Sequence, residues 1–348
     1  MNGDGRGGNT KRGDLITRLQ GQIRATLDPL IEPGRRFAMV EYPTHPNVGD
    51  HAIWLGETRY LAARSCPALF LSDRFGYSPD ALRRRLRPGD LIILHGGGNL
   101  GDIHPGPEAL RQSVLRTFTD VSILQLPQTI RFSDAEGLGA TRAAIDGHPD
   151  FTLLVRDRMS QEIAADSFNC TTMLCPDMAF MLGPLERPAP PSCNGLWIAR
   201  TDHESDPLMS RSELEDLPRA DWAPPSHRTM HKAAYHTLRW TNRGLGRYLA
   251  GRGNPSSALA ALSCRLFDPV ANRHLRSGLR LLGSSRVVVT DRLHAHILCL
   301  LLGVPHVLLD DRYGKVRGYV EAWTSDSDLV HMAADPDEAD SLVRSLLS

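Results

Sequence analysis

The chain has 348 residues, 41% of them apolar, and its 40 basic residues balance its 40 acidic ones. A chain of this length and composition can form two domains of average size. No apolar run approaches the roughly 20 residues needed to cross a bilayer, and the N-terminus lacks the apolar core of a signal peptide. We therefore expect a soluble protein that stays in the cytoplasm.

Cysteine and lysine usage both narrow the chemistry. The six cysteines form no C-x-x-C pair and mostly stand beside apolar residues, which favours small buried thiols over disulfides or a zinc site. Only three of the 40 basic residues are lysine: Lys11, Lys232 and Lys315. A desolvated lysine can lose its proton near neutral pH, whereas arginine cannot. Lys315, in a Tyr-Gly-Lys turn, is therefore a candidate for proton chemistry, with chance retention as the alternative.

The first half of the chain alternates short apolar runs with segments of helical period, which is typical of parallel α/β units. Residues 1–35 are expected to form a disordered, glycine-rich tail of about a dozen residues followed by a helix. A domain at 36–183 follows. Its strands are predicted at 37–42, 91–95, 121–126, 152–155 and 172–175, and its helices near 51–64, 107–118, 134–145 and 158–166.

A proline-rich stretch, 184–192, indicates a linker to a second domain at 193–348. This domain is predicted to contain strands at 196–200, 286–290 and 306–309, with a long insertion at 202–275. The segment from Trp222 to Thr290 carries eleven basic residues against one acid.

The part of this segment at 228–252, here called the basic arm, has two explanations. One is a solvated helical face. The other is a surface for an anionic partner, such as a lipid-linked sugar diphosphate at the inner face of the cell membrane. No motif for nucleic-acid binding is present, so nucleic acid is not an expected partner.

Ligands bind open parallel sheets outside the carboxyl ends of the strands. The first loop there, 43–50, ends in Asp50, which is predicted to be a helix N-cap. With Asn47, this carboxylate could orient a sugar hydroxyl or take its proton. The second loop, 95–102, contains three glycines in a row, and its amides could form an anion nest. A tight turn alone is the alternative. Candidate ligand-binding residues in the second loop are Gly97, Gly98 and Asn99.

Two further strand ends carry cations. Arg156 ends one strand and could bind a phosphate or carboxylate, while Asp177 after the next strand is expected to cap a short helix or support the site. In the second domain, Asp291 is predicted as N-cap of a helix whose first turn holds Arg292 and His294, where the helix dipole favours an anion.

His294 and His296 are an i, i+2 pair, which does not face one metal ion on a helix, so no metal site is expected. With Arg292 before it and Lys315 after the next strand, His294 lies in a predicted anion site. Either His294 or Lys315 could donate a proton there.

The motifs occur in a characteristic order: NVGD, GGGNLGD, LPQT, VRDRMS, PDMAF, TDRLHAHILCLLLGVPHVLLD and YGK. This order, over roughly residues 37–319, resembles the polysaccharide pyruvyl transferase family, and most closely the bacterial members that add pyruvate ketals to exopolysaccharides or cell-wall glycans. The resemblance implies a fold like the two-domain GT-B glycosyltransferases. The predicted fold is therefore α/β, with two Rossmann-like parallel-sheet domains facing across a cleft.

The resemblance also implies phosphoenolpyruvate as donor and a saccharide, free or lipid-linked, as acceptor, with no metal or cofactor. Asp50 matches the family's acidic residue in the first loop and would be the acceptor base. Lys315 matches the family's lysine after the last strand, and His294 or Lys315 would be the acid. The second domain would be the donor side and the first the acceptor side. Positions matching the family's donor-binding residues are Arg156, Arg292, Leu293 and His294.

Two other functions fit part of the pattern. A GT-B glycosyltransferase using a nucleotide sugar would also have two such domains and a glycine-rich loop. It would need a carboxylate for the nucleotide ribose in the second domain, and residues 292–315 offer no convincing one. A non-catalytic binder of glycans or lipid phosphates is the other alternative, and the combination of Arg292, His294 and Lys315 argues against it.

Overall fold

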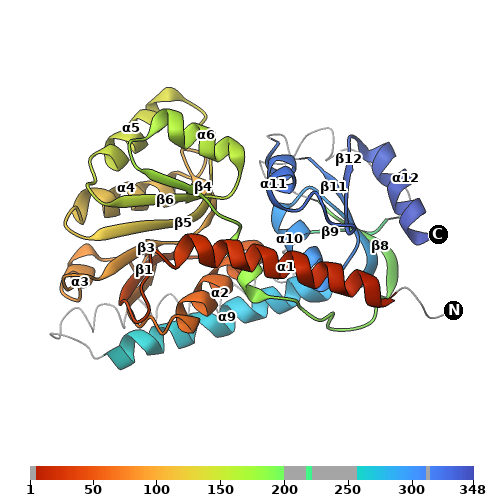
Figure 1. The fold of residues 1–348 in the computed structure, drawn as a ribbon, viewed down its shortest axis with the longest axis horizontal. Coiled ribbons are helices and arrows are strands. Elements are labelled where there is room, and N and C mark those ends of the chain that lie inside the picture. Colours follow the sequence, from red (N-terminus) through yellow and green to blue (C-terminus); the bar gives the residue numbers. More distant parts are fainter. Residues whose placement is uncertain (1–4, 200–216, 222–256, 311–313) are drawn as a thin grey trace.

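Two parallel β-sheets, one in each half of the chain, form the framework of the molecule (Figure 1). The computed structural model describes residues 5–199, 217–221, 257–310 and 314–348. The first sheet has the strand order β2-β1-β3-β5-β6-β7, with β4 paired to β5, and the second has the order β12-β11-β10-β8-β9. All described strand pairs are parallel. The prediction of an α/β fold with two parallel sheets is thus confirmed.

The first sheet is covered by helices on both faces, so its central strands are apolar runs such as Leu91–Leu94, which is buried throughout. Its strands are β1 (Phe37–Tyr42), β2 (Ala68–Asp73), β3 (Leu91–Leu94), β4 (Gly97–Leu100), β5 (Ser122–Ile130), β6 (Phe151–Val155) and β7 (Thr171–Leu174). Its helices are α2 (Val48–Ala63), α3 (Pro79–Arg83), α4 (Pro105–Thr117), α5 (Ala135–Asp146), α6 (Arg158–Ser167) and the short 3-10 helix η1 (Met178–Leu182).

The second sheet contains β8 (Cys193–Ile198), β9 (Arg219–Ala220), β10 (Ser285–Thr290), β11 (His306–Leu309) and β12 (Val330–Ala333). The helices of this half are α9 (Ser257–Gly283), α10 (Leu293–Leu302), α11 (Lys315–Trp323) and α12 (Pro336–Leu347). The basic arm at 228–252 lies outside the described residues, and a membrane contact through it stays a prediction. None of the described helices is long and apolar enough to cross a membrane.

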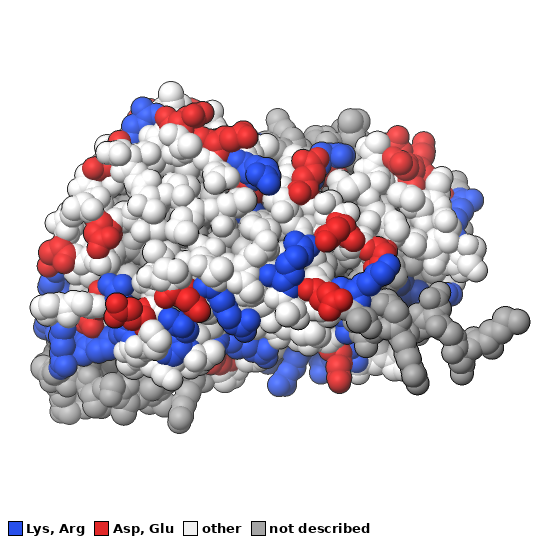
Figure 2. Space-filling model, viewed as in Figure 1, with Lys and Arg blue, Asp and Glu red and all other residues white. Residues whose placement is uncertain are grey.

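Helix α1 (Gly5–Leu27) corrects the expectation of a disordered tail, because the helix already begins at Gly5. Its apolar side chains recur at helical spacing and are buried: Leu15, Ile16, Leu19, Ile23 and Leu27. The helix lies across both halves of the molecule (Figure 1). Its Gln20 donates a hydrogen bond to the Phe180 carbonyl, and Arg18 pairs with Asp326 at 2.9 Å. Basic and acidic side chains alternate along this face (Figure 2).

Helix α9 belongs by sequence to the second half, yet it packs against α2 and β2 of the first (Figure 1). The Tyr42 and Phe267 rings stack with centroids 3.9 Å apart, and the Tyr42 hydroxyl donates to the Phe267 carbonyl at 3.1 Å. Trp54 Nε1 donates to Asp268 at 3.3 Å. The helix runs through the predicted end of the insertion at residue 275, and Phe267 and Asp268 lie before this end, so the last part of the predicted insertion packs against the first half.

A chain of buried hydrogen bonds links α10, β11 and the end of α11. His306 Nδ1 lies 2.8 Å from the Val304 carbonyl, which can only accept, so this nitrogen carries a proton. Burial lowers the pKa of both rings, so both are neutral at pH 7. His306 Nε2 then accepts from His296 Nδ1 at 2.7 Å, and His296 Nε2 accepts from the Thr324 hydroxyl at 3.0 Å. These contacts hold the His296 ring in the core, whereas His294 Nε2 lies beside Asp177 and Arg156.

We expect these two histidines to make folding stability fall as the pH is lowered. Burial lowers the pKa of His306 from 6.5 to about 4, and burial together with His306 lowers the pKa of His296 well below 6.5. Between these values the unfolded chain binds more protons than the folded chain, so stability decreases as pH falls from about 6.5 toward 4. Each histidine contributes about 1.4 kcal/mol per pH unit.

Urea unfolding at several pH values in this window measures the effect. The variant His306→Asn keeps a donor for the Val304 carbonyl and removes one titrating ring, so its stability should depend less steeply on pH. His104→Asn is the matched control, because His104 is a half-buried histidine that does not belong to this series of hydrogen bonds. Its stability should depend on pH as steeply as that of the wild type. Equal slopes for His306→Asn and the wild type would contradict the assignment.

Candidate active site

The loop between β1 and α2 places Asp50 in the first turn of α2, and Asn47 caps the helix. Asn47 Oδ1 accepts a hydrogen bond from the Gly49 amide at 3.1 Å, and Asn47 Nδ2 donates to Asp50 Oδ2 at 2.8 Å. The prediction of Asp50 as N-cap is therefore wrong, because Asn47 occupies the capping position. Burial alone would raise the pKa of Asp50, but His45 and His294 together lower it. Asp50 is thus a carboxylate at neutral pH.

Gly49 brings the two halves of the molecule into direct contact. A Cβ atom at this position would lie 2.3 Å from Cγ and Nδ1 of His294, closer than any side chain can approach. The N-terminus of α2 therefore rests on the first turn of α10. Because α2 follows β1 and α10 follows β10, the carboxyl ends of the two parallel sheets meet at this point.

Arg156, Asp177 and His294 form a buried polar cluster beside this contact. Arg156 Nη1 lies 2.7 Å from Asp177 Oδ2, and Arg156 Nε donates to the Thr129 hydroxyl at 2.9 Å. His294 Nε2 is 3.4 Å from the same Asp177 oxygen and 3.3 Å from Arg156 Nη1. Burial opposes ionisation of Asp177, but His294 and Arg156 outweigh it and hold its pKa well below the usual range.

The prediction that Asp177 caps a short helix is confirmed, since its Oδ1 accepts from the Ala179 amide at 2.9 Å and caps η1. Arg156 is only 2% exposed and is oriented by Asp177. Its Nη2 would lie 2.9 Å from a Cβ on Gly98, so the glycine loop passes directly over the guanidinium. A side chain at position 98 would separate the two.

The first turn of α10 differs from the prediction that Asp291 caps it. The N-cap residue is Arg292, whose own side chain makes no capping hydrogen bond. Thr290 turns the chain instead, because its hydroxyl accepts from the Arg292 amide at 3.1 Å. Arg292 Nη2 donates to Asp221 Oδ1 at 2.7 Å. Leu293 is 5% exposed and packs in the core, so a ligand there would meet its backbone amide.

The glycine loop is held by side chains that accept hydrogen bonds from several of its amides. Glu57 accepts from the Gly96 amide at 2.8 Å, and Gln128 accepts from the Asn99 amide at 3.1 Å. Glu108 accepts from the Gly101 amide at 3.0 Å. These contacts use the amides of Gly96, Asn99 and Gly101, and Gly97 pairs with Gln128 in the sheet, so an anion nest in this loop stays a prediction.

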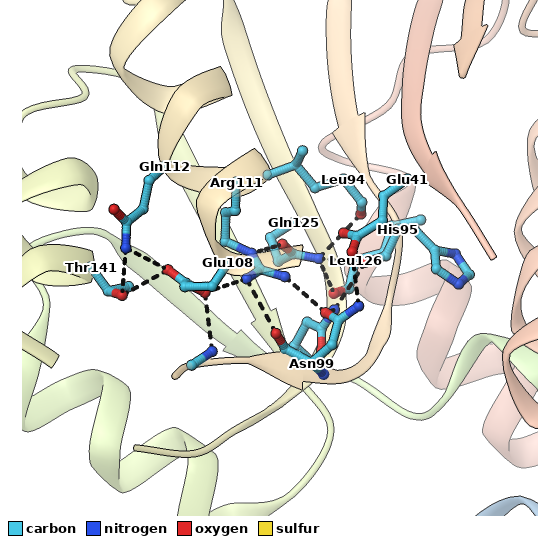
Figure 3. A network of polar contacts seen from close by, with 12 residues as sticks. Glu41, Leu94, His95, Asn99, Glu108, Arg111, Gln112, Gln125, Leu126 and Thr141 are labelled. Carbon is cyan, nitrogen blue, oxygen red and sulfur yellow. Dashed lines mark hydrogen bonds and ion pairs between the residues drawn. The ribbon is translucent and has the colours of Figure 1, made fainter. Parts of the chain in front are cut away.

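The Asn99 side chain, predicted to bind substrate, is engaged within the protein (Figure 3). Its Nδ2 donates to Glu41 at 3.1 Å, and its Oδ1 accepts from Arg111 and Gln128, each at 2.9 Å. This network fixes the loop in one conformation. Any contact of Asn99 with a ligand stays a prediction.

The family of the chain follows from comparison with known proteins. A family model described as polysaccharide pyruvyl transferase matches residues 47–312. The chain belongs to this family. Pyruvyl transferase 1 of Schizosaccharomyces pombe is 31% identical to it, over 90% of this chain and 76% of its own length. EpsO of Bacillus subtilis is also named as a pyruvyl transferase. It is 28% identical to this chain, over 88% of this chain and 90% of its own length. These matches support the assignment of this chain as a transferase.

A solved structure has a similar fold. It is that of a functionally uncharacterised protein of Klebsiella pneumoniae, which superposes with a TM-score of 0.59 over 90% of this chain and 99% of its own, at 18% identity. This likeness shows the α/β fold alone.

In the present structure, Lys315 belongs to the second half of the chain but lies beside the glycine loop of the first half. It follows Gly314, which adopts a left-handed conformation (φ 73°), and it begins α11. Residues 311–313, which include Tyr313 of the YGK motif, lie outside the described residues. Lys315 lines a hollow together with Gly98, Asn99, Leu100, Gly101, Ile103, His104, Thr129 and Arg131.

Sequence reasoning missed two acidic residues at this site. Glu41, at the carboxyl end of β1, has a left-handed backbone (φ 78°), which is rare and strained for a residue with a side chain. Nothing in the sequence signals it. Glu57 is fully buried and lies 2.7 Å from His95 Nδ1. An acid on the buried side of α2 is the signal that could have identified it.

Proposed function

We propose that the chain transfers the pyruvyl group of phosphoenolpyruvate to two hydroxyls of a saccharide, forming a ketal and releasing inorganic phosphate. The observation that carries this proposal is the contact of Gly49 with His294. It joins the carboxyl ends of both sheets and gathers Asp50, Arg156 and His294 at one place. A small molecule with several negative charges suits this place, because a guanidinium, an imidazole and the N-terminus of α10 meet there.

The arrangement also supports a GT-B-like cleft between the two sheets. Ligands of open parallel sheets bind outside the carboxyl ends of the strands, and here two such edges share one site. The donor would lie between the Arg156 cluster and the start of α10, with Lys315 at the glycine loop. The acceptor would enter on the side of Asp50. A lipid-linked acceptor would bring the protein to the inner face of the membrane.

The proposed reaction needs an acid and receptors for two anionic groups. Protonation of the methylene carbon of phosphoenolpyruvate makes C2 electrophilic, and an acceptor hydroxyl then bonds to C2. A second hydroxyl displaces phosphate, which leaves with the electrons of the C2–O bond. His294 or Lys315 supplies the proton. The proposal gives no role to a metal or cofactor, because cationic side chains can neutralise the phosphate.

Incubation with phosphoenolpyruvate and a panel of glycosides tests the function. Phosphate release should depend on both substrates, and in D2O the methyl group of the ketal should carry one deuterium from the solvent. UDP- and GDP-sugars in place of phosphoenolpyruvate should give no transfer. Turnover of a nucleotide sugar only, or of neither donor, would overturn the proposal.

A conservative change at Arg156 should separate charge from geometry. Arg156→Lys keeps a positive charge, but an ammonium cannot contact Thr129, Asp177 and His294 with the planar geometry of a guanidinium. We expect the KM for phosphoenolpyruvate to rise about tenfold or more, corresponding to the loss of roughly one charge-assisted hydrogen bond. Arg142→Lys, at an exposed arginine of α5, is the matched control. Equal KM values for both variants would contradict a donor-binding role.

A further inference from the structure

A histidine beside Asp50 has no assigned role. His45 lies in the loop before α2, with its Nε2 3.3 Å from Asp50 Oδ2. The side chain of His45 is 57% exposed, whereas that of Asp50 is 17% exposed. Asn47 Nδ2 donates to the same Asp50 oxygen at 2.8 Å. The carboxylate is thus turned inward and the imidazole outward.

The backbone carbonyl of His45 is held by the buried ring of His51. His51 Nε2 lies 3.1 Å from the His45 carbonyl, which can only accept, so this nitrogen donates. The His51 ring stacks on His274 of α9, with centroids 4.2 Å apart and planes 2° from parallel. Burial, and then His274, lower the pKa of His51 well below its ordinary value, so the donating ring stays neutral. The position of His45 is therefore set by packing between α2 and α9.

We propose that His45 is the base that takes the proton of the acceptor hydroxyl, and that Asp50 orients it. This inference rests on the proposed function and revises the role of Asp50. A buried carboxylate whose pKa is lowered is a weak base, and its Oδ2 already accepts from Asn47. An imidazole held by a carboxylate through one nitrogen can accept a proton at the other. Asp50 is then a positioning residue.

Because the His45 side chain is exposed, it can pass the protons of both acceptor hydroxyls to solvent. As the first acceptor oxygen bonds to C2, its proton passes to His45 Nδ1, while the methylene carbon receives a proton from the acid on the donor side. His45 releases its proton to solvent and accepts the proton of the second hydroxyl. Phosphate leaves as this second oxygen bonds to C2.

Chemical rescue tests this role. We expect His45→Ala to lower kcat by about 10²–10⁴-fold, with the KM for phosphoenolpyruvate changed by less than about threefold. Added imidazole should restore a large part of the rate, because the site of an exposed side chain admits a small base. His45→Gln should lose the same activity without rescue, since glutamine fills the space of the ring. Thr44→Ala, in the same loop, should match the wild type with and without imidazole.

Thermal unfolding of each variant checks that it is folded. Asp50→Asn should lower kcat and should not respond to imidazole, because the native ring is still present. A wild type without transfer from phosphoenolpyruvate would overturn the proposed function, and this inference with it. An active wild type with unchanged His45→Ala and His45→Gln, or a folded His45→Ala that imidazole does not rescue, would overturn the role of His45 alone.

Discussion

Replacing His294 with asparagine is expected to lower kcat for pyruvyl transfer by about 10²–10⁴-fold. His294 Nε2 contacts both Arg156 and Asp177, and its ring packs on the first turn of α2. Asparagine preserves a polar side chain next to Asp177 but cannot carry a proton to the methylene carbon. The KM for phosphoenolpyruvate should change much less than kcat, because the cations that bind its anionic groups remain.

Comparison of Lys315→Gln with His294→Asn shows which of the two residues is the acid. Steady-state and single-turnover rates of phosphate release should fall most for the residue that donates the proton and less for the one that stabilises the departing phosphate. His331→Asn, on β12, serves as the control for loss of a histidine elsewhere. If His294→Asn keeps kcat within about threefold of the wild type, His294 is neither acid nor phosphate ligand.

Gly49→Ala is expected to have a large effect although glycine has no functional group. The added methyl would lie 2.3 Å from the His294 ring and 2.6 Å from its Cβ, so α2 and α10 must move apart. Inserting a methyl group into a well-packed contact costs about 1–3 kcal/mol of folding stability. Activity should fall by about 10²-fold, because displacing a catalytic group by about 1 Å has an effect of this size.

Gly139→Ala in α5 is the matched control, because nothing lies within 4 Å of its added methyl group. Alanine in a helix interior should be neutral or should stabilise the fold by up to about 1 kcal/mol. Urea unfolding and transfer assays on both variants separate the effect of the contact from that of alanine itself. Equal stability and activity of the two variants would show that α2 and His294 do not touch.

Local patterns determined the layers of the fold and the positions of its site loops. Apolar runs such as Leu91–Leu94 report burial on both faces of a sheet, and strand 306–309 was predicted at its observed bounds. The edge strand β2 and the glycine-rich β4 were missed. β4 has little intrinsic strand preference, and it forms because its ends pair with β5 and side chains hold its amides.

Capping could be predicted only to within a few residues. Asp50 has a suitable side chain, yet Asn47 makes the capping hydrogen bond of α2, and Asp291 lies one residue before Arg292, the N-cap of α10. The difference depends on the backbone angles of a few residues, and these follow from how the loop packs. The left-handed Glu41 is the extreme case, because only the surrounding network holds it in that conformation.

The two α/β units, the loops at their carboxyl edges and the identity of the cationic residues could be predicted from the amino-acid sequence. These features depend on hydrophobic periodicity and on topology, which are readable along the chain. Three contacts could not be predicted in this way: Gly49 meets His294, Asp177 orients Arg156, and His45 lies beside Asp50. Such pairings join residues from different elements, and their distances are set by the packing of whole helices and sheets against one another.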